Sequence, residues 1–563
     1  MKRELTEGNR MNHLSNRAFG KIFAALWLSV ALAAPAATDS RSMALASKWG
    51  RFEQSFRSTL GYASPLSDVS LSVVFTSPLG ETTTVNGFWD GGRIWRVRFS
   101  PDQPGNWTFT TTCSDTTNTN LHHITGEFLC TPTVGRSRFD LHGPVRISKD
   151  GRHLEHQDRT PFFWLADTVW NGALLSKPKD WEYYARVRSS QKFTVAQWLA
   201  TPGGDLRKQI PYTGNEHILL HPDYFRQLDA KIESLERDGI LSAIVPLWEI
   251  KSQGSNTLDN LPETQAILLL RYLVARWGAH NVVWELTCEG DTMGGKVGRW
   301  KRIGRAVFGD APHAVVILNP GETYWTLEEF RTERWVSVFG YQSGQETSDD
   351  ASQWLLAGPV SKDWRKEPAR PFINLAPPFE NAAPNPSPQR TDPHAVRRAA
   401  YWSLCNAPAS GVSYGADGVP DWRVENKVKL VSYRPQPLPT WQKALFLPAA
   451  RQMGILADAL GTTDFRRLVP AQELVASQPG LVSPSRYIAA MRSDSGDVAM
   501  VYIPEDRTVE LVQEALPLSP LSVWINPRTG EHKPAEALKK GAIMQFTTPE
   551  AGDWLLRLNG SMR

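Results

Sequence analysis

Strand-like and helix-like segments alternate across residues 136–470, and this alternation constrains the fold more than any other feature of the sequence. The strand-like segments are short, apolar and rich in β-branched and aromatic residues, while the segments between them place apolar residues at helical spacing. Eight strands alternating with helices over this length predict a (β/α)8 barrel. The expected strands lie at 162–167, 193–198, 240–249, 281–291, 314–318, 335–339, 371–375 and 411–415.

Strand-rich segments flank the predicted barrel on both sides. From about residue 45 to 133, short strands are separated by Gly, Pro and Asn at expected turns, which predicts a β-sandwich. Residues 471–563 again alternate between strand and turn. We therefore expect a multidomain chain with an N-terminal β-sandwich at 45–133, a central (β/α)8 TIM barrel at 136–470 as the catalytic domain, and a C-terminal all-β, sandwich-like domain.

Residues 1–36 have the layout of a secretory signal. Arg17 and Lys21 precede an apolar run over 22–34, which ends in a small-residue cleavage site at 34–36. The run is too short to span a bilayer as a helix, and no later stretch is long and apolar enough to do so. We therefore expect removal of the signal and export to the periplasm or the exterior.

The composition is that of an ordinary globular protein. The chain has 563 residues, of which 41% are hydrophobic and 21% charged, with a formal net charge of +4 and no long Lys/Arg run, so a nucleic-acid partner is not indicated. The four cysteines show no zinc spacing. Cys113 and Cys130 lie in one predicted β-region and are either a bridge or two buried thiols; if the chain is exported, we predict the bridge.

Polar side chains at the carboxyl ends of the predicted strands are the candidates for chemistry, because barrel active sites form there. No nucleophile elbow, phosphate loop or dinucleotide motif occurs, and His is scarce at these ends, so we expect neither a metal nor a cofactor. The remaining carboxylates, amides and aromatics suit glycoside cleavage, in which one acid protonates the leaving oxygen and a second carboxylate attacks or activates water. The candidates are Asp167, Trp170, Gln197, Trp198, Glu249, Glu289, Asp291, Asn319, Gln342, Glu380 and Tyr414.

Two of these candidates are expected to be catalytic. Glu289 follows the fourth strand and Glu380 follows the seventh, so the two carboxylates are expected to face each other across the mouth of the barrel. The others are expected to position a sugar. For Asp167, substrate contact and a structural role in capping the next helix remain as alternatives.

Several of these segments resemble the apiosidase-like glycoside hydrolases, typified by family 140. The fourth-strand segment at 283–291 matches the place where the family's strand ends in its acid/base, which implies that role for Glu289. Other matching segments are 162–170, 341–344, 399–402 and 414–418 in the barrel, 87–91 and 105–107 in the N-terminal domain, and 524–530 and 552–554, which resemble a collagen-binding-type β-domain.

Two positions depart from the pattern of this family. Its seventh strand usually ends in Glu-Pro, with that Glu a candidate nucleophile, whereas Ala376 precedes Pro377 here and the nearest carboxylate is Glu380. Its fifth strand often ends in His-Pro, and this chain has Asn319 before the proline. The leading interpretation is an exported glycoside hydrolase acting on a polysaccharide or oligosaccharide, with Glu289 as proton donor and Glu380 as nucleophile or base.

Two other functions compete with this interpretation. The first is a non-catalytic carbohydrate-binding protein on a degenerate barrel, which Ala376 favours. The second is collagen or protein binding through the C-terminal domain, which rests on the resemblance of that domain alone.

We predict that residues 1–36 are absent from the mature protein. The charged flank, short apolar run and small-residue site are those that signal peptidase recognises. N-terminal sequencing of protein recovered outside the cytoplasm should give a first residue near Ala37. A chain that begins at Met1 or Met11 would contradict the prediction.

Overall fold

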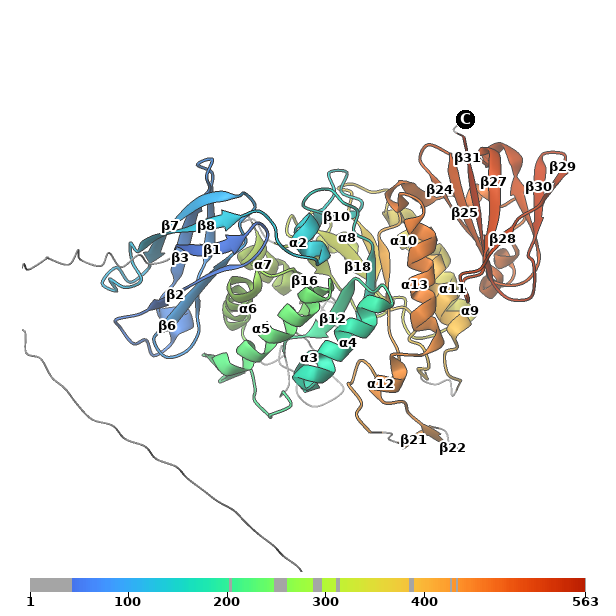
Figure 1. Cartoon of the computed structure of the whole chain (residues 1–563). Coiled ribbons are helices and arrows are strands. Elements are labelled where there is room, and N and C mark those ends of the chain that lie inside the picture. Colours follow the sequence, from blue (N-terminus) through green and yellow to red (C-terminus); the bar gives the residue numbers. More distant parts are fainter. Residues whose placement is uncertain are drawn as a thin grey trace, which may run out of the picture. The chain divides into compact units, whose positions relative to one another are not determined.

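The computed structural model describes residues 43–561 except 202–204, 248–260, 287–295, 310–313, 384–388, 426–427 and 432–433. Its central region is a closed barrel of eight parallel strands, which confirms the predicted fold (Figure 1). In barrel order the strands are β11 (Trp164–Thr168), β12 (Val195–Leu199), β15 (Leu241–Val245), β16 (Val282–Leu286), β17 (Val316–Leu318), β18 (Val338–Tyr341), β19 (Phe372–Asn374) and β20 (Gly411–Tyr414).

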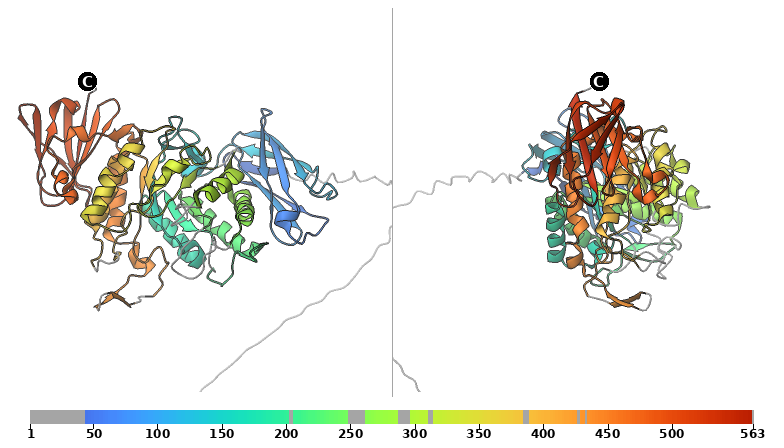
Figure 2. Two further views of the ribbon diagram at one scale, coloured as in Figure 1. Left: turned by 180° about the vertical axis from the view of Figure 1, so that it is seen from behind. Right: turned by 90° about the vertical axis from the view of Figure 1, so that its right-hand side faces the viewer.

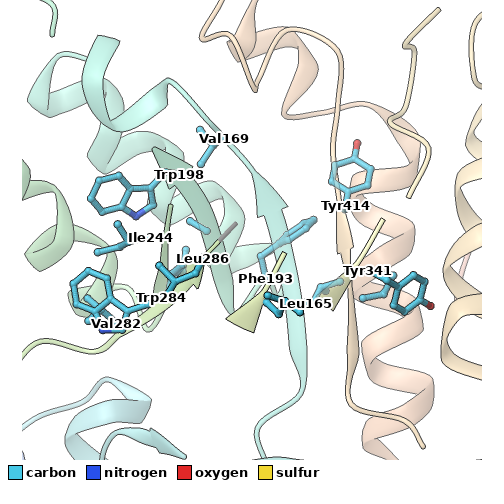
Figure 3. Close-up of a cluster of buried hydrophobic side chains, with 14 of the residues drawn as sticks. Leu165, Val169, Phe193, Trp198, Ile244, Val282, Trp284, Leu286, Tyr341 and Tyr414 are labelled. Atoms are coloured by element: carbon cyan, nitrogen blue, oxygen red, sulfur yellow. The ribbon is translucent and has the colours of Figure 1, made fainter. Parts of the chain in front are cut away.

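Alternate residues of most barrel strands enter two different apolar clusters. One set points inward and packs together inside the barrel, as Ala166, Val283 and Ile317 do. The other set points outward and packs under the helices, as Leu165 and Trp284 do (Figure 3). Because both faces of these strands are buried, the strands read as nearly continuous apolar segments in the sequence.

Helices lie outside the ring of strands (Figure 2). Proline at the first or second position begins four of them, because its fixed φ suits a helix start and its missing N–H has no partner there. The longer helices are α4 (Pro178–Ser190), α5 (Pro222–Arg237), α6 (Glu263–Trp277), α7 (Val297–Phe308), α9 (Asp349–Ala357), α11 (Pro393–Cys405) and α13 (Pro448–Gly461). Short helices are α2 (Arg138–His142), α3 (Gly172–Leu175), α8 (Leu327–Phe330), α10 (Val360–Asp363) and α12 (Trp441–Ala444).

The N-terminal domain has a five-stranded sheet, β1-β8-β7-β3-β4, and a three-stranded sheet, β2-β6-β5, around one aromatic core. Its strands are β1 (Ala44–Ser47), β2 (Phe52–Arg57), β3 (Leu71–Thr76), β4 (Thr82–Asn86), β5 (Phe88–Trp89), β6 (Ile94–Phe99), β7 (Gly105–Cys113) and β8 (Thr125–Thr131). Buried ion pairs, including Arg98 with Asp229 at 2.8 Å and Arg276 with Asp90 at 2.9 Å, connect this domain to α5 and α6.

The predicted Cys113–Cys130 bridge is wrong. Both residues are free, buried thiols. Strands β7 and β8 do pair, but Cys130 lies opposite Gly105, at the other end of β7 from Cys113. Cys113 is eight positions after Gly105 along β7, which is roughly 27 Å at about 3.4 Å per residue.

The C-terminal domain is all β, as predicted. A six-stranded sheet, β23-β24-β25-β31-β27-β28, and a three-stranded sheet, β26-β30-β29, enclose a core that includes Trp524 and Trp554. The strands are β23 (Leu468–Pro470), β24 (Ala489–Ser493), β25 (Val498–Ile503), β26 (Thr508–Val512), β27 (Leu518–Ile525), β28 (His532–Pro534), β29 (Ala537–Lys540), β30 (Ile543–Thr547) and β31 (Trp554–Ser561). Arg397 of α11 forms a buried ion pair with Asp553, at 2.7 Å, next to β31.

Candidate active site

Three inward-facing polar side chains form a hydrogen-bonded row at the carboxyl ends of β16, β17 and β18. Asn319 donates from Nδ2 to Oε2 of Glu285, at 2.9 Å. Gln342 donates from Nε2 to Oδ1 of Asn319 and to the carbonyl oxygen of Pro320, both at 2.9 Å. Because carboxyl ends of barrel strands open into the mouth, this row (Glu285, Asn319 and Gln342) forms a polar floor beneath it.

Glu285 is the only member of the row that carries a titratable group. Its side chain is fully buried, and burial raises its pKa from the usual 4.5 to about 8, while the Asn319 hydrogen bond acts in the opposite direction. With this pKa the carboxyl is mostly protonated at pH 7. Glu285 is not among the site residues predicted from the sequence, although it is a lone charged residue within the apolar segment Val282–Leu286, four positions before Glu289 in the sequence.

Gln197 on β12 forms hydrogen bonds with the end of β19 and with β20. Its Nε2 donates to the carbonyl oxygen of Leu375, at 3.3 Å, directly before Ala376. Its Oε1 accepts from Ser413, which in turn accepts from the indole of Trp164 at 3.2 Å. The side chain has no exposed surface, so Gln197 supports the end of β19 from inside the barrel.

Among the aromatic candidates in the described part of the chain, Trp170 lies at the mouth. It follows β11, is half-buried, and packs on Leu199 and Val245, the last residues of β12 and β15. An indole in this position offers a face on which a sugar ring can stack. Trp198 instead points outward and packs against Trp277 of α6 in a T-shaped contact.

Asp167 also points outward, between β11 and α4. Arg188 of α4 donates to both of its oxygens, at 2.8 and 3.3 Å, and Tyr184 donates at 2.9 Å. The carboxylate is fully buried. This position does not support substrate contact; it gives Asp167 a structural role in holding α4, although not as a cap of its N-terminus.

Glu380 lies on the loop after β19 and points away from the mouth. Its two oxygens accept from the backbone N–H of Ala449, both at 3.0 Å, in the first turn of α13. Tyr414, which also points outward, donates its hydroxyl to Glu380 at 2.6 Å. Burial raises the pKa of Glu380, and these hydrogen bonds counteract the effect. The arrangement is that of an acid at a helix N-terminus.

The structure thus brings together Gln197, Asn319, Gln342 and Trp170 inside or at the mouth of the barrel, and places Asp167, Trp198, Tyr414 and Glu380 outside it. The predicted site residues Glu249, Glu289 and Asp291 lie outside the described residues. In the part of the chain that is described, no group of three or more His, Cys, Asp or Glu side chains is arranged to hold a metal ion. The same part contains no helix long and apolar enough to cross a membrane.

A closed parallel barrel with a polar floor at its carboxyl end defines a (β/α)8-barrel protein, and comparison with known proteins identifies the class. Residues 148–467, more than half of the chain, match the family model described as "Apiosidase-like, catalytic domain". The chain therefore belongs to the apiosidase-like family and is a glycosidase. Residues 46–114 match a domain of unknown function, DUF5060, and residues 469–559 match the "Putative collagen-binding domain of a collagenase".

Solved structures show the same fold at low sequence identity. A glycoside hydrolase family 5 protein from Bacteroides vulgatus has a TM-score of 0.64 at 20% identity, covering 76% of this chain and 95% of its own. A "putative glycoside hydrolase" from the same organism has a TM-score of 0.68 at 18% identity, covering 92% and 99%. No match was found among curated proteins.

We predict that Glu380→Gln destabilises the protein rather than acting on turnover. The substitution removes the charge at the start of α13 and one of the two acceptor oxygens, which should lower the free energy of unfolding by about 1–3 kcal/mol. Denaturant unfolding measures the change, and Tyr414→Phe, which removes only the hydroxyl donor, is the matched control. A large fall in kcat with unchanged stability would instead place Glu380 in the mouth.

We also predict that Glu285 makes stability depend on pH. Between about pH 4.5 and 8 the folded protein keeps the Glu285 proton and the unfolded chain releases it, so this contribution to stability is complete below 4.5 and is lost as pH rises to about 8. The free energy of unfolding of wild type relative to Glu285→Gln should therefore fall across this range, by at most about 1.4 kcal/mol per pH unit. A difference that stays constant with pH would show that the carboxyl ionises normally.

Proposed function

We propose that this chain is an exported glycosidase that cleaves glycosidic bonds in an oligosaccharide or polysaccharide, with Glu289 as the proton donor. The observation that carries the proposal is the polar floor inside the barrel, with Glu285, Asn319 and Gln342 beneath a mouth bordered by Trp170. Amide and carboxyl groups suit sugar hydroxyls, and an indole suits the apolar face of a sugar ring. Glu289 follows the same strand as Glu285.

The second carboxylate of the reaction is not Glu380 in this proposal. Both oxygens of Glu380 are occupied by α13 and Tyr414, and the residue directly after Leu375 is Ala376, which has no functional group. Glu249 after β15 and Asp291 after β16 follow strands whose ends reach the mouth, so one of them is proposed as the nucleophile or base.

A carbohydrate-binding protein without catalysis is the second candidate, and a specific observation favours it. Ala376 stands at the strand-seven end, and the nearest carboxylate after it supports a helix rather than the mouth. Such a protein would use the same floor and Trp170 to bind a sugar but would not hydrolyse it. Binding without turnover across a broad panel of polysaccharides would favour this function.

We predict that Glu289→Gln lowers kcat by a factor on the order of 10² or more on the substrate that such a panel identifies, because the amide cannot protonate a leaving oxygen. The measurement is steady-state hydrolysis, with unfolding curves to confirm that the variant is folded. Glu329→Gln is the matched control, since Glu329 is an exposed acid on the short helix α8. Full activity of Glu289→Gln would overturn its assignment as the acid.

The second carboxylate has its own measurement. Glu249→Gln and Asp291→Asn are compared on the same substrate, and the variant of the nucleophile or base should lose activity to a degree similar to Glu289→Gln. If azide restores activity and a glycosyl azide forms, the anomeric configuration of that product would report on which side of the sugar the lost carboxylate lies. Activity retained in both variants would contradict the proposal that Glu249 or Asp291 is the nucleophile or base.

A further inference from the structure

Glu285 has an unusual position for a carboxyl group. It lies inside the barrel on β16, two residues after the core residue Val283, and is opposite Ile317 of β17 in the strand register. One oxygen, Oε2, accepts from Asn319. The other oxygen, Oε1, is buried and has no hydrogen-bond partner among the residues that the structure describes. A buried polar atom without a partner is costly, so its retention calls for a ligand or solvent oxygen that pairs with it.

The direction of the hydrogen bonds along the row determines which oxygen of Glu285 accepts and which can donate. The carbonyl oxygen of Pro320 can only accept, so Gln342 must turn its Nε2 toward it. The same Nε2 reaches Oδ1 of Asn319, which leaves Nδ2 of Asn319 to donate to Oε2 of Glu285. The proton of a neutral Glu285 is therefore on Oε1, which becomes a hydrogen-bond donor.

The surroundings of Glu285 keep it neutral. The described inward-facing side chains of β15, β17 and β18 and of the residues directly after them are uncharged. They are Leu241, Ala243 and Val245 on β15, Ile317 on β17 with Asn319 after it, and Val338 on β18 with Gln342 after it. Glu249, Glu289 and Asp291 follow β15 and β16 outside the described residues. Burial is the largest cause of the raised pKa of Glu285.

We propose that Glu285 is a specificity-determining residue of the carbohydrate site, in which its Oε1 hydroxyl donates a hydrogen bond, directly or through one water molecule, to an uncharged hydroxyl oxygen of the bound sugar. This inference rests on the proposed function, because it assumes that a sugar occupies the mouth. It assigns Glu285 to binding and not to proton transfer, since Glu289 is the proposed proton donor. Deprotonation turns the donor into an acceptor and removes the hydrogen bond.

Infrared difference spectroscopy tests the proton directly. At pH 7 the wild type should show the carbonyl band of a protonated carboxylic acid that is absent from Glu285→Gln, and this band should disappear as pH rises through about 8. Adding the oligosaccharide that the panel identifies should shift the band. The Glu289→Gln background is used for this step, so that sugar binds without turnover. If the band is missing at pH 7, or if it does not shift at a saturating concentration of the sugar, the proposal is overturned.

Kinetics test the role in binding. Glu285→Gln keeps an N–H donor at every pH, so its KM should rise only about threefold and should stay flat above pH 8, where the wild-type KM rises. Glu285→Leu has similar size and no donor, and its KM should rise about tenfold or more at all pH values, with a smaller effect on kcat. If Glu285→Gln loses kcat as Glu289→Gln does, or if Glu285→Leu binds as wild type does, the assignment is wrong.

The two proposals fail in different ways. If the infrared band and the KM pattern expected for Glu285 are absent while Glu289→Gln is inactive, the binding role of Glu285 is wrong and the proposed glycosidase activity stands. Full activity of Glu289→Gln with the Glu285 band and KM pattern in place removes the proton-donor assignment and leaves the binding role. Sugar binding without hydrolysis, with the band shifted, supports Glu285 in a carbohydrate-binding protein.

Discussion

Closure of the parallel sheet between β11 and β20 is the constraint on which the rest of the barrel depends. The pairing of Trp164 with Gly411 and of Asp167 with Tyr414 brings together segments about 250 residues apart in the chain. Gly411 has a φ of +151°, and a side chain there would collide with the backbone of Trp164, so only glycine permits this approach. Once the ring is closed, the carboxyl ends of all eight strands meet at one mouth.

The closed ring also sorts polar residues by strand parity. Asp167 and Tyr414 have the outward parity and hold helices α4 and α13 through Arg188 and Glu380. Breaking a buried pair such as Asp167–Arg188 leaves a lone charge and costs roughly 3–5 kcal/mol, so stability constrains this acid. Residues of the inward parity, such as Gln197 and Glu285, do not hold the helices in this way, so their side chains are available to the mouth of the barrel.

Much of the fold could be predicted because the barrel strands are short apolar segments, separated by segments whose apolar residues have helical spacing. The sixth strand begins at Val338, three residues later than predicted, because Trp335 lies in a turn and packs against Gly304 of α7. The disulfide prediction failed because two cysteines in one sheet need not be opposite each other, and register decides their distance.

The sequence by itself determined that the chain has a parallel barrel between two β domains, and that carboxylates and amides gather at the strand ends. Only the tertiary structure decided which of them face the mouth. When both faces of a strand are apolar, the sequence does not tell which parity points inward, and so Asp167 and Gln197 looked alike. For Glu380, the deciding contact is the Ala449 N–H, 69 residues further along the chain, which becomes a neighbour only after the barrel has closed.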